Sequence, residues 1–145
     1  MPKAAAFWQP NSLATVLGHY LKKQEEMMAR VITFFPKQTL VGDYSTEGVH
    51  YSEIFELSDI EQLAVQMHVI AYTWTGAITA EVEETSDPSF RDDAWAVNGT
   101  GFSMSVAGTP SGRTFSGLKR FVRAKISVPS GRAATIFMEG VARSQ

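Results

Sequence analysis

Residues 119–141 read KRFVRAKISVPSGRAATIFMEGV, in which apolar and polar residues alternate on both sides of a Pro-Ser-Gly-Arg turn. A period of two is typical of a strand that buries one of its faces. The residues expected to face a core are Val122, Ala124, Ile126, Val128, Ala134, Ile136 and Met138. Proline, serine and glycine supply the backbone angles that a chain reversal needs. The stretch therefore predicts two strands joined by a tight turn as a hairpin.

The same period of two recurs along the chain after Pro36. Strands are expected at residues 62–71, 78–83 and 102–106, with shorter ones at 39–42 and 50–57. The segments between them are rich in Gly, Pro, Asn, Asp and Ser, which are typical turn residues. About seven or eight short strands without helical crossovers predict a mainly β protein, an antiparallel sandwich or barrel.

Before Pro36 the pattern is different. Residues 1–10 hold Phe7 and Trp8 between two prolines, and side chains of this size favour a contact surface over water. Apolar residues then recur with a helical period, which predicts an amphipathic helix at about 12–31. Its apolar face would carry Leu13, Val16, Leu17, Tyr20, Leu21, Met27, Met28 and Val31. We therefore expect an arm and helix at 1–36 that serve assembly, and a β-sandwich domain at 37–145.

Composition limits the classes of function. The chain has 145 residues, of which 44% are hydrophobic and 19% are charged, so one domain with its own core is expected. Thirteen Lys and Arg against fifteen Asp and Glu give a net charge of −2, which provides no bulk attraction to nucleic acid. The absence of cysteine excludes disulfides and thiolate metal sites. With no signal-like or membrane-spanning apolar run, we expect a soluble protein made in the cytosol that does not contact membranes.

Motifs of cofactor, phosphate, metalloprotease and hydrolase sites are absent from the sequence. We therefore expect no enzymatic activity, no catalytic residue, no cofactor and no metal. His19, His50 and His68 are interpreted as ordinary surface or interface side chains, because nothing in the sequence places them beside carboxylates.

Two groups of acidic residues invite a chemical interpretation. Asp87, Asp92 and Asp93 fall in one expected loop, where the choice is between a Ca²⁺ site and solvated carboxylates. Arg91 among them favours solvated carboxylates. The second group is expected to line an exposed strand face and comprises Glu81, Glu83 and Glu84.

Aromatic and basic residues suggest binding surfaces. The aromatic residues either stack on sugars or bases or, the interpretation we favour, fill the ends of the sandwich; they are Tyr44, Tyr51, Tyr72, Trp74 and Trp95. Alternation places Arg123 and Lys125 together on the outer face of their strand. We expect this face to meet acidic protein surface, because arginine suits contacts with carboxylates at interfaces.

Residues 50–145 resemble a β-sandwich module of tailed-phage virion proteins. The resemblance rests on residues 80–87 through Trp95, which parallel a stretch of the type LEGSxDGxxW, and on a Ser-rich strand at 102–106. It also rests on an aromatic-Arg strand at 118–126 and a last strand at 134–141. The chain departs from the pattern by a longer insertion at 88–94 and by lacking the glycine after Asp87. The resemblance implies a jelly-roll-like or discoidin-like sandwich of seven to eight strands and brings no catalytic residues with it.

These observations favour a structural subunit of a bacteriophage particle, with the virion as its location. Its partners would be other virion proteins and further copies of itself. Within that role, a capsid-associated decoration or vertex protein is favoured over a tail or connector subunit. The alternative is a carbohydrate-binding module for host or glycan recognition. The residues expected to bind a partner are Phe7, Trp8, Leu13, Leu17, Tyr20, Met27, Met28, Arg123 and Lys125.

Overall fold

The computed structural model describes residues 29–57 and 62–143. The predicted arm and residues 12–28 of the predicted helix lie outside this part of the chain. Residues 30 and 31, at the end of the predicted helix, instead belong to a strand. The β-branched residues Val31, Ile32 and Thr33 explain this, because they favour the extended backbone of a sheet over a helix.

The described residues form ten strands and one short 3₁₀ helix, η1 (Asp92–Ala94). The strands are β1 (Arg30–Val41), β2 (Gly48–Tyr51), β3 (Phe55–Glu56), β4 (Gln62–Tyr72), β5 (Ala77–Thr85), β6 (Ala96–Val97), β7 (Phe102–Ser105), β8 (Ser111–Ser116), β9 (Phe121–Val128) and β10 (Ala133–Arg143). The expectation of a mainly β protein is therefore confirmed.

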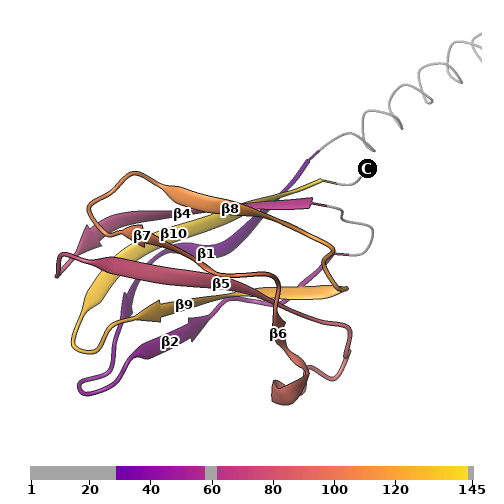
Figure 1. Cartoon of the computed structure of the whole chain (residues 1–145), viewed down its shortest axis with the longest axis horizontal. Helices are drawn as coiled ribbons and strands as arrows, with labels where there is room; N and C mark the ends of the chain where they lie inside the picture. Colours follow the sequence, from indigo (N-terminus) through magenta and orange to yellow (C-terminus); the bar gives the residue numbers. More distant parts are fainter. Residues whose placement is uncertain (1–28, 58–61, 144–145) are drawn as a thin grey trace, which may run out of the picture.

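The strands form two antiparallel sheets (Figure 1). One has the order β1-β10-β4-β8 and the other β2-β9-β5-β6. The short strand β3 pairs with β9 beyond β2, and β7 pairs with β5 beyond β6, so each pair acts as one interrupted strand. Counted in this way, the chain has eight strands and crosses to the other sheet at every connection except the one from β5 to β6. This is the strand order of a jelly roll.

The hairpin predicted at 119–141 is wrong, although both of its strands exist. Strand β9 pairs with β2 and β5 in one sheet, whereas β10 pairs with β1 and β4 in the other. The turn at 129–132 therefore carries the chain from one sheet to the other. Alternation shows that each strand buries one face. It does not show whether two consecutive strands pair with each other in one sheet or lie in two sheets that face each other.

The core lies between the two sheets and is built from the inward residue of each alternating pair. All seven residues that alternation assigned to the core of 119–141 are buried. Strand β1 contributes Ile32, Phe34 and Phe35, which are at most 3% exposed. The sandwich therefore begins before Pro36, and the boundary expected at 36/37 falls inside β1.

Pro36 is tolerated within β1 because this strand lies at the edge of its sheet. A proline lacks the N–H that a central strand must donate, and proline in sheets is found on edge strands or at bulges. The register of β1 against β10 shifts between Thr33 and Phe35 and again between Phe35 and Gln38. As a result, residues 36–39 are exposed while Phe34 and Phe35, next to each other in sequence, are both buried.

Candidate functional site

Arg123 lies at the centre of a cluster on the outer face of the sheet that contains β9. Its guanidinium carbon is 4.1 Å from the ring centroid of Tyr51 and 4.2 Å from that of Trp95. Its Nε donates to Oε1 of Glu83 at 2.9 Å. The side chains of Arg123 and Glu83 are only 16% and 11% exposed. We call these four residues the Arg123 cluster.

The cluster follows from the register of two neighbouring strands. Glu83 of β5 lies opposite Arg123 of β9, and Glu81 lies opposite Lys125. Residues directly opposite on one face of an antiparallel pair are close enough for their charges to attract. The Lys125 Nζ is 4.0 Å from Oε2 of Glu81, and this pair is more exposed than the first.

The expectation that Glu83 and Glu84 line an exposed face is wrong, because both are only 8% exposed. Glu83 is covered by its partner Arg123. Glu84 lies on the same face of β5 as the core residues Ile78, Ala80 and Val82. Its Oε2 accepts hydrogen bonds from Asn98 Nδ2 at 3.0 Å and from the backbone N–H of Lys119 at 2.9 Å. Hydrogen bonds of this kind compensate for the loss of hydration when a carboxylate is buried.

Arg123 therefore has its partners inside the chain. A guanidinium stacked between two rings and paired with a carboxylate offers little free positive charge. The predicted contact of Arg123 and Lys125 with an acidic partner finds no support in this arrangement. The sequence alone does not pair the acidic residues of β5 with the basic residues of β9, because only the register between the two strands brings them together.

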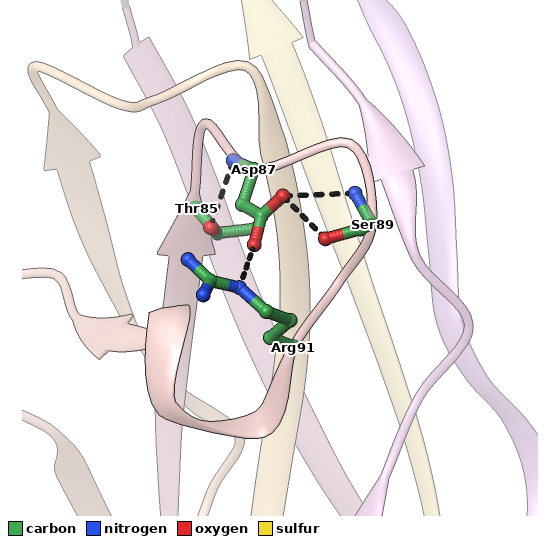
Figure 2. Close-up of polar contacts among 4 residues, drawn as sticks. All are labelled: Thr85, Asp87, Ser89 and Arg91. Carbon is green, nitrogen blue, oxygen red and sulfur yellow. Dashed lines mark hydrogen bonds and ion pairs between the residues drawn. The ribbon is translucent and has the colours of Figure 1, made fainter.

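The loop between β5 and β6 is held by Asp87 (Figure 2). Its backbone N–H donates to Thr85 Oγ1 at 3.0 Å. One carboxylate oxygen accepts from the N–H and the hydroxyl of Ser89 at 2.9 and 2.6 Å, and the other accepts from Arg91 Nε at 2.9 Å. The hydrogen bond from the Ser89 hydroxyl lowers the pKa of Asp87 well below its usual range, and the hydrogen bond from Arg91 is the second largest cause.

Asp87 therefore organises the loop and is not simply a solvated acid. No group of three or more His, Cys, Asp or Glu in the described part of the chain is arranged to hold a metal ion. The loop also carries Phe90, whose φ of 53° is rare for a bulky residue. The ring of Phe90 packs on Phe121 with centroids 4.9 Å apart and stacks on Trp95 at 6.1 Å. These contacts hold the loop against the outer face of β9.

A groove of about 750 Å³ runs between β1 and β2, the edge strands of the two sheets. We call it the edge groove. It is lined by Thr33, Phe34, Phe35, Pro36, Gln38, Leu40, Val49, His50, Tyr51, Ser52 and Glu53. At one end, Nε2 of His50 lies 2.7 Å from the carbonyl oxygen of Val41, so it donates a hydrogen bond that ties β2 to β1.

The edge groove is not among the sites predicted from the sequence, although Pro36 between two apolar runs is a usable signal for it. A proline within an alternating pattern indicates an edge strand. Which other edge it faces depends on the topology, and no local pattern contains this information.

The five aromatic residues considered for stacking do not gather on one face. Trp95 is occupied by Arg123 and Phe90, Trp74 packs against the core, and Tyr44 is 99% exposed. Tyr51 lines the edge groove. A second hollow of about 490 Å³ is formed by Tyr72, Thr73, Trp74, Thr75 and Arg132.

The other residues expected to bind a partner, from Phe7 to Met28, lie outside the described part of the chain. In the sequence they precede β1, the strand that lines one side of the edge groove. Within the described residues, none of the helices is long and apolar enough to cross a membrane.

No family model matches the chain, and no curated protein matches it in sequence. Similar solved structures include the SPBc2 prophage-derived protein YomS, with a TM-score of 0.48 and 13% identity over 79% of this chain and 92% of that one. A structure of infectious bursal disease virus, Gx strain, gives 0.45 and 12% over 79% of this chain and 31% of that one. The cellulose-specific carbohydrate-binding module CBM28 gives 0.40 and 11% over 81% and 73%. The similar structures therefore include a prophage-derived protein, a virus structure and a carbohydrate-binding module.

Proposed function

We propose that the chain is a non-enzymatic structural subunit of a bacteriophage particle, and that it works through contacts with other proteins of the particle. A capsid-associated position, as a decoration or vertex protein, is the role we favour. The chain would then be located in the virion, with copies of itself among its partners.

One observation carries this proposal more than any other. The segment with Phe7 and Trp8 precedes β1 in the sequence, and β1 is an edge strand that borders an open groove. A subunit that assembles needs a surface to offer and a segment that reaches a neighbour, and this chain has candidates for both. By contrast, Arg123 and Glu83, and Asp87 and Arg91, are paired with each other within the chain.

Purified particles test the proposal. The phage lysate is separated on a density gradient, and the chain is quantified by mass spectrometry against a known particle protein. We expect a fixed number of copies per particle that survives a high-salt wash. A parallel culture that expresses the chain without particles controls for aggregates of similar density. Recovery of the chain only from the soluble fraction would contradict the proposal.

The hollow at Tyr72 favours a second candidate function, carbohydrate binding. Tyr72 and Trp74 place two aromatic rings beside Arg132 and two threonines, and aromatic rings with nearby polar groups suit a sugar. A glycan screen with the wild-type chain and Tyr72→Ala tests this function. Tyr44→Ala is the matched control, because Tyr44 is fully exposed and does not line the hollow. Binding that is lost only in Tyr72→Ala supports it, and no binding by the wild-type chain removes it.

A further inference from the structure

We infer that the edge groove receives residues 1–10 of a second copy of this chain, with Phe7 and Trp8 as the anchoring side chains. This inference rests on the proposed function, because it names the contact through which copies of the subunit would assemble. Three features of the molecule support it: the shape of the groove, the chemistry of its lining, and the sequence that joins residues 1–10 to β1.

The groove has the shape that an extended segment needs. It follows β1 over residues 33–40, which corresponds to about 26 Å of extended chain. Both of its walls are edge strands, and an edge strand presents backbone groups to which a further segment can hydrogen-bond. Residues 1–10 contain Pro2 and Pro10, which favour an extended backbone.

The lining of the groove complements residues 1–10. Pro36, Val49 and Tyr51 are its exposed apolar residues, and a Phe or Trp side chain buries about 150–250 Å² when it is covered. Among the charged side chains, Glu53 lines the groove while Lys3 is the charged residue of the arm. The arm therefore complements the groove in two ways: it brings large apolar side chains, and its charge is opposite to that of Glu53.

The sequence between the arm and β1 favours a second copy over the same chain. To return directly to its own edge groove, the chain would have to reverse just before Arg30. From His19 to Phe35 there is no Gly, Pro, Asn, Asp or Ser, the residues that turns prefer. As far as residue 28 the sequence also carries the predicted helical period, which favours a continuous helix over a reversal of the chain. Since each copy gives one arm and offers one groove, the contact closes only as a reciprocal pair or a symmetric ring.

Cysteine cross-linking of the full-length chain tests the inference, because the natural sequence has no cysteine to interfere. One chain carries Gln9→Cys and a mass tag, and the second, untagged chain carries Gln38→Cys in the groove. After mixing, a short bifunctional thiol reagent is added, and the products are separated by mass. We expect the mixed dimer. Adding Phe7→Ala and Trp8→Ala to the tagged chain should lower its yield at least about tenfold, because anchoring aromatics dominate such contacts.

A cysteine at a position outside the edge groove provides the control. Ser116 is exposed on β8, at the opposite edge of its sheet from β1. Equal cross-linking of the tagged chain to Ser116→Cys would overturn the inference, and so would no cross-linking at all. A chain with both Gln9→Cys and Gln38→Cys that cross-links only to itself would show that the arm occupies its own groove.

The test uses purified chain and needs no particles, so its result is independent of the proposed function. A mixed dimer without incorporation into particles would retain the arm contact and remove the phage role. Incorporation without a mixed dimer would do the reverse.

Discussion

The Arg123 cluster and the edge groove share one residue, Tyr51, but differ in what their side chains contact. One surface of Tyr51 stacks on Arg123, which is also paired with Glu83 and covered by Trp95. The same residue lines the groove, where β1 and β2 have no further strand beside them among the described residues. Arg123 and Lys125 therefore have their partners in the chain, whereas the open surface lies along two strand edges. A sequence shows which residues are charged, but only the register of the strands shows whether those residues already have partners of opposite charge.

The largest expected effect comes from removing the first part of β1, residues 30–36. A chain that starts at residue 37 loses Ile32, Phe34 and Phe35, whereas a chain that starts at residue 29 keeps them. Truncating one buried Phe costs about 3–5 kcal/mol, and the whole domain has about 5–15 kcal/mol of stability. We expect the shorter chain to be unfolded or insoluble and the longer one to give a cooperative β-type melt by circular dichroism. Equal melting of the two chains would show that residues 29–36 do not belong to the core.

A smaller effect is expected from breaking the Arg123 cluster. Arg123→Ala removes an ion pair and two ring contacts, and it leaves the largely buried Glu83 without its ion-pair partner. We expect this variant to lower the free energy of unfolding by about 2–3 kcal/mol. Lys125→Ala, the matched control on the same strand face, breaks a more exposed pair and should cost less than about 0.5 kcal/mol. Urea unfolding measures both values. Similar losses for the two variants would contradict the distinction between the two pairs.

The smallest effect, and one that depends on pH, is expected at Asp87. Because its pKa is lower in the folded chain than in the unfolded chain, the Asp87 interactions stabilise the fold above the usual aspartate pKa. This contribution is lost as the pH falls through the lowered pKa. The melting temperature of the wild type should therefore exceed that of Asp87→Asn at pH 7, and the difference should shrink as the pH falls below about 5. A difference that stays constant between pH 7 and pH 3 would argue against a role for the charge, and Asp92→Asn serves as the control.

The sequence predicted the β class and the buried face of most strands, because alternation is a local property. Val122, Ile126, Ile136 and Met138 were assigned to the core from their spacing alone, and all are buried. What it could not predict was pairing between distant segments. The tight turn at 129–132 joins two sheets instead of two paired strands, because the partners of each strand lie far away in the chain.

The start of the sandwich was misplaced for a related reason. The sequence predicts a boundary at Pro36, because proline ends most regular elements. On an edge strand it interrupts nothing, since its missing N–H would face away from the neighbouring strand. Glu83 and Glu84 were likewise expected to be exposed, because their hydrogen-bonding partners come from β9 and from residues 98 and 119.

The measurement that tests the account most directly compares folding and assembly of the double variant Phe7→Ala with Trp8→Ala. The melting temperature of the isolated chain and the number of copies in purified particles are measured for the variant and the wild type. If residues 1–10 contact a neighbour, the melting temperature stays unchanged while the copy number falls at least about tenfold. A clear drop in the melting temperature, with the copy number retained, would show that the arm serves its own fold, and the account would be contradicted.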